Sequence, residues 1–343
     1  MKLLILSTLL FAHCTPMSVT CDNDYSCTVT QLAEHQVRHL VVHPFETVSN
    51  LKLRDTHLRV LVVSSLHPTL HQLSLERCQI DRLVVTADCT LSFLTLDKTI
   101  GSIQTLHGAR LRHLFVSKSE IASLLPALVN LTALETIRLS KMHIPTFDFD
   151  LLRDMEKLFI LELHYNHIEE LKLSPNSTCC PNLTEIDLSF NRIATLDLAL
   201  ISSLKGLKRL RLSYNKIAQL NGTLELPHLL ELNLASNRIK SIDLCAWNIG
   251  ALMVLNVNNN QIDRMPNCIA KLQHLMNICI ADNLLVEVDL ALLAYPSLLH
   301  TDFSRNRITA VHNYHALSRD VCLMLEGNPI RNSTDACRGI EIN

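Results

Sequence analysis

Apolar residues recur along most of the chain as pairs separated by one residue. A clear example is Leu210-Arg-Leu-Ser-Tyr-Asn215-Lys-Ile217, where an asparagine and a further aliphatic residue follow the leucine pair. The same phrase returns at 186–193, 232–239 and 255–262. Alternation with a period of two predicts a short strand with two inward side chains and one outward side chain between them.

We call the place of Asn215 in its phrase the ladder position. Residues at equivalent places follow one another at intervals of 20 to 25 residues. They are Thr56, Cys78, Thr99, Ser119, Met142, Asn166, Asn191, Asn215, Asn237, Asn260, Asn283, Asn306 and Asn328. A period in the twenties indicates leucine-rich repeats. Because one repeat cannot bury its own leucines, we expect an α/β solenoid, a horseshoe of about 13 units with a parallel concave sheet and disulfide-containing caps.

The chemistry of the ladder position changes along the chain. The last eight ladder residues are asparagine, whose amide both donates and accepts hydrogen bonds, so stacked asparagines can satisfy the turns of neighbouring repeats. Threonine, cysteine and serine substitute only partly, and Met142 does not. We therefore predict a less regular N-terminal third with a break near Met142. Segments between repeats, such as 150–158 and 200–204, are expected to be helical turns or irregular backbone.

The order of segments predicts an exported protein. The apolar run from Leu3 to Ala12 is too short to span a bilayer and is typical of a signal peptide. We assign 1–20 to the signal peptide, with cleavage between about 14 and 20, 21–50 to an N-terminal cap and 51–321 to repeats. Residues 322–343 form the last repeat and the C-terminal cap. We expect a secreted, extracellular chain with no membrane anchor.

Composition narrows the function classes. A formal charge of -2 gives no general attraction to nucleic acid, and 7 glycines argue against dinucleotide-binding and phosphate-loop enzymes. The sequence contains no Gly-x-Ser-x-Gly, His-Glu-x-x-His or Cys-x-x-Cys motif. We predict no enzyme activity, no cofactor and no metal site.

The 12 cysteines of an exported chain indicate disulfides. Positions near the two ends favour cap bridges, and equivalent positions in adjacent coils lie within bridging distance. The predicted pairs are Cys21 with Cys27, Cys322 with Cys337, and Cys245 with Cys268.

The remaining cysteines leave alternatives open. Cys78 is either a buried free thiol or the partner of Cys89. Removal of Cys14 with the signal peptide leaves 12 - 1 = 11 cysteines. An odd number indicates an intermolecular bridge or reactive thiol, or else one unpaired buried cysteine. The candidate intermolecular thiols are Cys179, Cys180 and Cys279, which makes a disulfide-linked dimer one expectation.

Five Asn-x-Ser/Thr sequons are candidate glycosylation sites. Those in polar linkers are favoured over those that fit the repeat by chance. The favoured sites are Asn176, Asn221 and Asn332, and the others are Asn130 and Asn182.

The outward residues form columns along the expected concave face. The residue before the ladder position is basic in four consecutive repeats and aromatic in the next three, which indicates anchors for a protein partner with an acidic edge. The candidate partner-binding residues are Arg77, Lys98, Lys118, Arg138, Lys141, Glu162, Tyr165, Asp187, Phe190, Arg211 and Tyr214. The alternative is an ordinary repeat surface, because an aromatic residue before this asparagine is common and Glu76 and Asp97 partly neutralise the basic residues.

The repeat phrase, the Cys21–Cys27 opening and the Cys322–Cys337 closure resemble secreted leucine-rich repeat proteins over essentially the whole mature chain. In style the sequence is similar to the mosquito leucine-rich immune proteins. That resemblance implies soluble haemolymph factors that pair through disulfides and coiled coils and hold complement-like thioester proteins. After Cys337 this sequence has neither the double-cysteine segment nor the heptads of that family. We therefore expect a short member without coiled-coil pairing.

The expected function is secreted protein binding through the concave face, as an innate-immune recognition or scaffold factor in insect body fluid. The expected partner is a complement-like thioester protein or another leucine-rich repeat protein, and not a nucleic acid. The alternative is a secreted adhesion, matrix or receptor-modulating protein.

Overall fold

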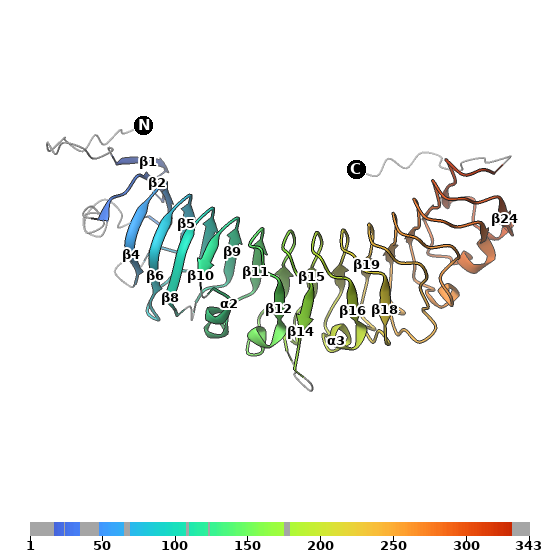
Figure 1. Ribbon diagram of the computed structural model, residues 1–343, viewed down its shortest axis with the longest axis horizontal. Coiled ribbons are helices and arrows are strands. Elements are labelled where there is room, and N and C mark those ends of the chain that lie inside the picture. The colour runs from blue at the N-terminus through green and yellow to red at the C-terminus, as the bar shows by residue number, and fades with distance from the viewer. Residues whose placement is uncertain are drawn as a thin grey trace. The chain divides into compact units, whose positions relative to one another are not determined.

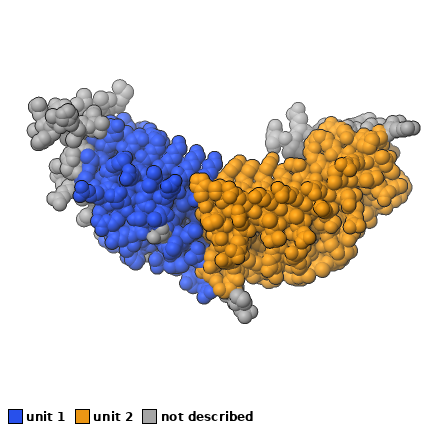
Figure 2. All heavy atoms as spheres, viewed as in Figure 1, with its two compact units in different colours: residues 1–142, 151–158 blue, residues 143–150, 159–343 orange. Residues whose placement is uncertain are grey.

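The computed structural model describes residues 17–23, 25–34, 48–64, 69–107, 110–122, 124–174 and 179–330. The chain forms two compact units (Figure 2): unit 1 contains 1–142 and 151–158, and unit 2 contains 143–150 and 159–343. The division falls at Met142. Each unit is a parallel β-solenoid of stacked repeats, which confirms the predicted fold class. Within the described residues, no helix is long and apolar enough to cross a membrane.

Unit 1 begins with a disulfide-closed hairpin. Strands β1 (Ser18–Asn23) and β2 (Ser26–Thr30) pair antiparallel, and the Cys21–Cys27 bond joins them. Strand β2 then pairs in parallel with the first repeat strand, so the hairpin covers the first layer of the solenoid. Strand β1 begins at Ser18, inside the range 1–20 that the sequence analysis assigned to a signal peptide. Residues 35–47 of the predicted cap lie outside the described residues.

The main sheet of unit 1 consists of parallel strands, one from each repeat. After the hairpin these are β3 (Asn50–Arg54), β5 (Gln72–Glu76), β7 (Phe93–Asp97), β9 (His113–Ser117) and β11 (Thr136–Ser140). The leucine pairs align from strand to strand, and Leu94 and Leu96 in β7 are fully buried. Alternate residues therefore point out of the sheet on what we call its outer face.

Unit 1 contains a second parallel sheet, formed by the segments between the main-sheet strands (Figure 1). It contains β4 (His57–Val63), β6 (Gln79–Val85), β8 (Ile100–Leu106) and β10 (Glu120–Ala122). The prediction of helical or irregular connections is wrong for these repeats, and so is the prediction of a less regular N-terminal third. Aliphatic residues such as Leu61 and Val63 alternate inward and favour strands, and α2 (Leu124–Ala127) and η2 (Leu128–Asn130) follow only after β10.

The main sheet of unit 2 has shorter strands, again one per repeat. They are β13 (Ile160–Glu162), β15 (Glu185–Asp187), β17 (Arg209–Arg211), β19 (Glu231–Asn233), β20 (Val254–Asn256), β21 (Asn277–Cys279), β23 (His300–Asp302) and β25 (Cys322–Met324). Each buries its central residue, and the strands pair in register.

The return segments of unit 2 are mixed. Strand pairs alternate with single helical turns, as predicted for 200–204. The strand pairs are β12 (Thr146–Asp148) with β14 (Glu170–Lys172), β16 (Thr195–Asp197) with β18 (Gln219–Asn221), and β22 (Glu287–Asp289) with β24 (Ala310–His312). The helical turns of unit 2 are α3 (Leu198–Ser202), η4 (Ile269–Lys271), η5 (Leu290–Leu293) and η6 (Tyr314–Ala316). A further turn, η3 (Phe149–Leu152), contains residues of both units.

The asparagines of unit 2 form the hydrogen-bonded ladder that the sequence predicts. The Asn215 Nδ2 donates to the Leu188 carbonyl of the preceding repeat at 2.9 Å and to the Leu212 carbonyl of its own repeat at 3.0 Å. Its Oδ1 accepts the Ile193 backbone N–H at 3.0 Å. The same links recur at Asn191, Asn237, Asn260, Asn283 and Asn306. Each buried side chain therefore joins two adjacent repeats.

Hydroxyl and thiol groups occupy the ladder position in unit 1. The Thr99 Oγ1 lies 3.1 Å from the Leu75 carbonyl and 3.2 Å from the Asp97 carbonyl, and Ser119 makes equivalent contacts. One hydroxyl hydrogen serves two acceptors there, whereas an amide donates two hydrogens. Met142 is only half-buried, unlike the other ladder residues of unit 1.

The cysteines separate into bonded and free groups. The Cys245–Cys268 bond is present with a Cα–Cα distance of 5.0 Å, and Cys322 is disulfide-bonded while its predicted partner Cys337 lies outside the described residues. Cys78 and Cys89 are buried and free, so they do not pair with one another.

The prediction of an intermolecular thiol is wrong for two of the three candidate cysteines. Cys179 and Cys180 are bonded to each other and buried. Neither sulfur is therefore available as a free surface thiol, and Cys279 is the remaining candidate of the three.

Candidate functional site

The residue before each ladder position adopts a left-handed backbone conformation. In twelve consecutive repeats, from that of Asp55 to that of Arg305, the residue at this place has a φ between 49° and 57°. A non-glycine residue is disfavoured in this region, and here the ladder contacts on the next residue hold the turn. We call these residues the edge column, because each stands at the end of a main-sheet strand.

In unit 1 the edge column is partly neutralised. The Arg77 guanidinium forms a two-point ion pair with Asp55 at 2.6 and 2.8 Å and also contacts Glu76. Lys98 and Lys118 are exposed and have no ion pair within the described part of the chain. Lys141 is also exposed. The predicted basic residues are thus on the surface, but the Arg77 guanidinium is already ion-paired with Asp55 and Glu76.

The Glu76 carboxylate contacts several cations at the N-terminal end of the outer face of unit 1. Lys52 and Arg54 from the adjacent strand β3 both contact its carboxylate, Arg54 at 2.9 Å. Hydrogen bonding to Lys52 lowers the pKa of Glu76 from 4.5 to about 2. The carboxylate is therefore ionised at physiological pH and serves the structure of this face.

An aromatic cluster on the outer face of unit 1 was missed by the sequence analysis. The Phe93 ring lies 4.9 Å from the His113 ring and 4.7 Å from the Phe115 ring. The Arg138 guanidinium, one of the predicted site residues, lies over Phe115 at 4.7 Å. Phe93 and His113 occupy the first residue of their strands, and comparison of that third outward column would have revealed them.

In unit 2 the three predicted aromatic residues form a continuous stack. The Tyr165 and Phe190 rings are 4.1 Å apart with an interplanar angle of 8°, and the Phe190 and Tyr214 rings are 4.2 Å apart at 7°. Tyr165 is 44% exposed and Tyr214 is 53% exposed. We call these three residues the aromatic ridge. The two tyrosines cover both faces of Phe190, so this central ring presents only its edge to solvent.

The charged candidates of unit 2 lie on the strands beside the ridge. His164 lies between Glu162 and Asp187, with Nδ1 4.0 and 3.9 Å from their carboxylate oxygens. This Nδ1 is the one buried side-chain nitrogen or oxygen in the described residues without a hydrogen bond. The sequence analysis did not identify His164, which follows the end of β13 and lies outside the two columns compared.

Arg211 is paired within the structure. Its guanidinium makes a two-point ion pair with Glu231 at 3.0 and 3.1 Å. Glu231 also lies 3.7 Å from Arg209, which in turn contacts Glu185. Arg211 therefore contributes to a network along the outer face and is not a free cation.

Cys279 is a half-buried free thiol on the outer face of β21. Burial and the nearby Asp302 raise its pKa to about 11. The group is a neutral thiol at physiological pH and a weak nucleophile.

Three candidate sequons lie in the described residues. Asn130, Asn182 and Asn221 are exposed, while Asn176 and Asn332 lie outside them.

Comparisons with known proteins give a fold-level likeness. The leucine-rich repeat family model matches residues 181–239, and a search of curated sequences gives no match. A leucine-rich repeat protein from Leptospira interrogans is similar at 20% identity and a TM-score of 0.62, over 84% of this chain and 86% of that one.

Two further solved structures are similar in fold. The complex of the mosquito proteins LRIM1 and APL1C is matched at 18% identity and a TM-score of 0.57, over 77% of this chain and 48% of that one. The TLR13–ssRNA13 complex is matched at 17% identity and a TM-score of 0.51, over 90% of this chain and 54% of that one.

Proposed function

We propose that this chain is a secreted, non-enzymatic binding protein that captures a protein partner on the outer face of its sheets, as an innate-immune recognition or scaffold factor. The leucine-rich repeat solenoid is typical of binding scaffolds and supports this class. The likeness in fold to the LRIM1/APL1C complex supports an immune role. Complement-like thioester proteins and other leucine-rich repeat proteins are the partners that we propose.

The aromatic ridge is the observation that carries the proposal. Tyrosine is enriched among the residues that contribute most to the affinity of protein interfaces, and both tyrosine and phenylalanine are more frequent in interfaces than on the rest of the surface. The ridge is rigid, because each ring is stacked and each backbone is fixed by a ladder asparagine. A partner therefore orders few side chains when it binds, which reduces the entropic cost of association.

The test is affinity capture from the native body fluid followed by mass spectrometry. Secreted wild-type protein is immobilised beside Phe190→Ala and Tyr214→Ala, and Asn259→Ala is the matched control from the same edge column. Asn259 is exposed, and its side chain makes one hydrogen bond, to Ser236 at 3.1 Å. Each aromatic variant should weaken capture by about 30-fold, the effect of losing roughly 2 kcal/mol at an interface anchor.

Unchanged capture by both aromatic variants would move the binding surface away from the ridge. Circular dichroism and thermal melting of each variant establish that the fold is retained. Enrichment of a plasma protein together with induction of the chain by infection is the expected result. Retention on cells or matrix would instead place the protein with secreted adhesion and matrix proteins.

A further inference from the structure

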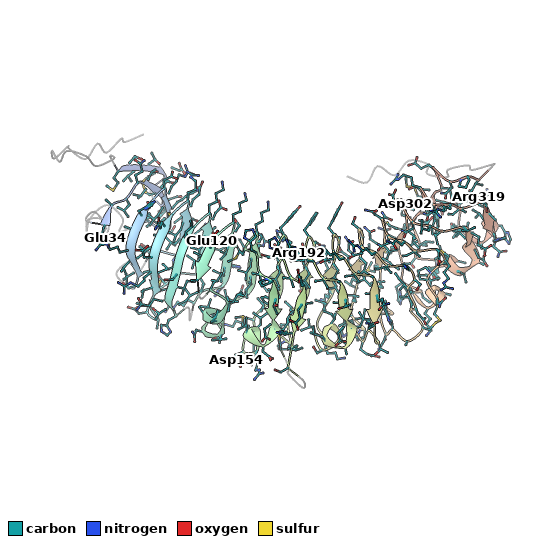
Figure 3. The ribbon with its side chains drawn as sticks, in the orientation of Figure 1. Glu34, Glu120, Asp154, Arg192, Asp302 and Arg319 are labelled. Atoms are coloured by element: carbon teal, nitrogen blue, oxygen red, sulfur yellow. A yellow bond between two sulfur atoms is a disulfide. The ribbon has the colours of Figure 1, made fainter. Side chains whose placement is uncertain are left out.

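The residue that follows each ladder asparagine forms a second column in unit 2. In three consecutive repeats this residue is Arg192, Lys216 and Arg238, and all three are exposed. We call these residues, with the neighbouring Lys240, the basic turn column. Arg192, labelled in Figure 3, lies in the turn after β15.

Backbone hydrogen bonds hold this column in line. The Lys216 N–H donates to the Ile193 carbonyl at 2.9 Å, and the Arg238 N–H donates to the Ile217 carbonyl at 2.8 Å. The same bond joins Arg192 to the repeat before it. Successive Cα atoms are therefore separated by one repeat spacing, about 5 Å in a parallel sheet.

The column is not neutralised by the protein. Arg192 has one distant ion pair, with Glu169 at 3.9 Å, and both groups are exposed. Lys216, Arg238 and Lys240 have no ion pair to any residue that the structure describes. The residues flanking the column on the same turns are uncharged: Phe190, Tyr214 and Ser236 before the asparagines, and Ala194 and Ala218 after them.

Other charged turns of the same unit behave differently. Asp282 and Arg305 occupy adjacent repeats of the edge column and pair at 2.7 Å, so opposite charges compensate one another there. Like charges about 5 Å apart lie within one Debye length and repel. Within the described residues, the ion pair of Arg192 with Glu169 offsets this repulsion at one position only, whereas an external polyanion would offset it along the whole basic turn column.

We propose that the basic turn column binds a linear sulfated polysaccharide. Sulfate groups along such a chain supply repeated negative charges to a straight row of cations, and guanidinium groups suit two-point contacts with oxyanions. Single-stranded nucleic acid is disfavoured, because its bases stack on free aromatic faces, and stacking within the adjacent ridge covers both faces of Phe190 and one face of each tyrosine. This site adds to the proposed protein-binding function and does not depend on it.

The test measures binding of a heparin decasaccharide to the secreted protein by surface plasmon resonance from 0.05 to 0.3 M NaCl (about physiological at 0.15 M). The test variant is Lys216→Glu with Arg238→Glu. The matched control is Lys205→Glu with Lys208→Glu, which makes the same change in net charge at exposed residues before β17.

Wild-type protein should bind heparin and not desulfated heparin. The turn-column variant should lose about 10-fold or more in affinity and show a shallower salt dependence, by about one unit of slope for each lost contact. The control should bind as wild type does. Equal losses in both variants, no heparin binding by wild type, or tighter binding of a polyuridine strand of equal charge would each overturn the proposal.

Discussion

Removal of one ladder amide tests how the repeats of unit 2 are held together. In Asn215→Ala the buried N–H of Ile193 loses its partner. The carbonyls of Leu188 and Leu212 each lose one of two donors, because Asn191 and Asn237 still donate to them. A buried polar group left without a hydrogen bond costs about 1–3 kcal/mol. The unsatisfied N–H at the low end of that range, together with two lost hydrogen bonds at about 1 kcal/mol each, gives an expected loss of about 3 kcal/mol in the free energy of unfolding.

Equilibrium urea unfolding followed by circular dichroism measures this loss, with the slope of the transition compared between variants. The matched control is Asn233→Ala, one repeat away, because that asparagine is half-exposed and accepts one hydrogen bond, from Ala235 at 3.1 Å. The control should lose less than about 1 kcal/mol. The ladder reasoning is refuted if Asn215→Ala costs no more than Asn233→Ala.

Three further predictions concern single positions. A Cβ at Gly101 would stand 1.7 Å from the Ile80 carbonyl oxygen, so Gly101→Ala should destabilise unit 1 by about 3 kcal/mol or more in urea unfolding. The control is Gly250→Ala, which has open space around it and should change the unfolding free energy by under about 0.5 kcal/mol. With its pKa raised to about 11, Cys279 should react slowly with iodoacetamide at pH 7.5 and faster toward pH 11, and rapid labelling at pH 7.5 would contradict its thiol state. Because the folded-state pKa of Glu76 is lowered from 4.5 to about 2, the stability that its carboxylate contributes is complete above pH 4.5 and is lost as the pH falls toward 2. Glu76→Gln should therefore cost about 1 kcal/mol of unfolding free energy at pH 7 and make that free energy less dependent on pH in acid. An unaltered pH dependence would count against the ion pairs of Glu76.

The repeat architecture was accessible from sequence because its signals are local. The Leu210–Leu212 pair fixes which residues face inward, and the asparagine after it fixes the turn. The second sheet of unit 1 was missed because all segments between repeats were predicted to be helical turns or irregular backbone. The adjacent β-branched residues Val62–Val63 and Val84–Val85 carried the strand signal that this assignment ignored.

The site was predictable in its columns but not in its pairings. Tyr165, Phe190 and Tyr214 were identified because they occupy the same place in three consecutive repeats, which puts their rings next to one another. A charged residue in a column forms an ion pair only if its rotamer brings it to an opposite charge on a neighbouring repeat, and the sequence does not give the rotamer. The ion pairs of Arg77 with Asp55 and of Arg211 with Glu231 were therefore not predicted. The bond between Cys179 and Cys180 was missed because adjacent cysteines were considered only as partners for other residues.

The ladder asparagines link each repeat only to its nearest neighbours. The side chain of Asn237, for example, bonds to the Leu212 carbonyl and the Ile217 N–H of the preceding repeat and to the Leu234 carbonyl of its own. Insertion or deletion of one whole repeat therefore rejoins identical hydrogen-bonding ends. Such a change would lengthen or shorten the basic turn column by one charge, so the reach of this surface along a linear ligand can vary between related chains while the fold stays the same.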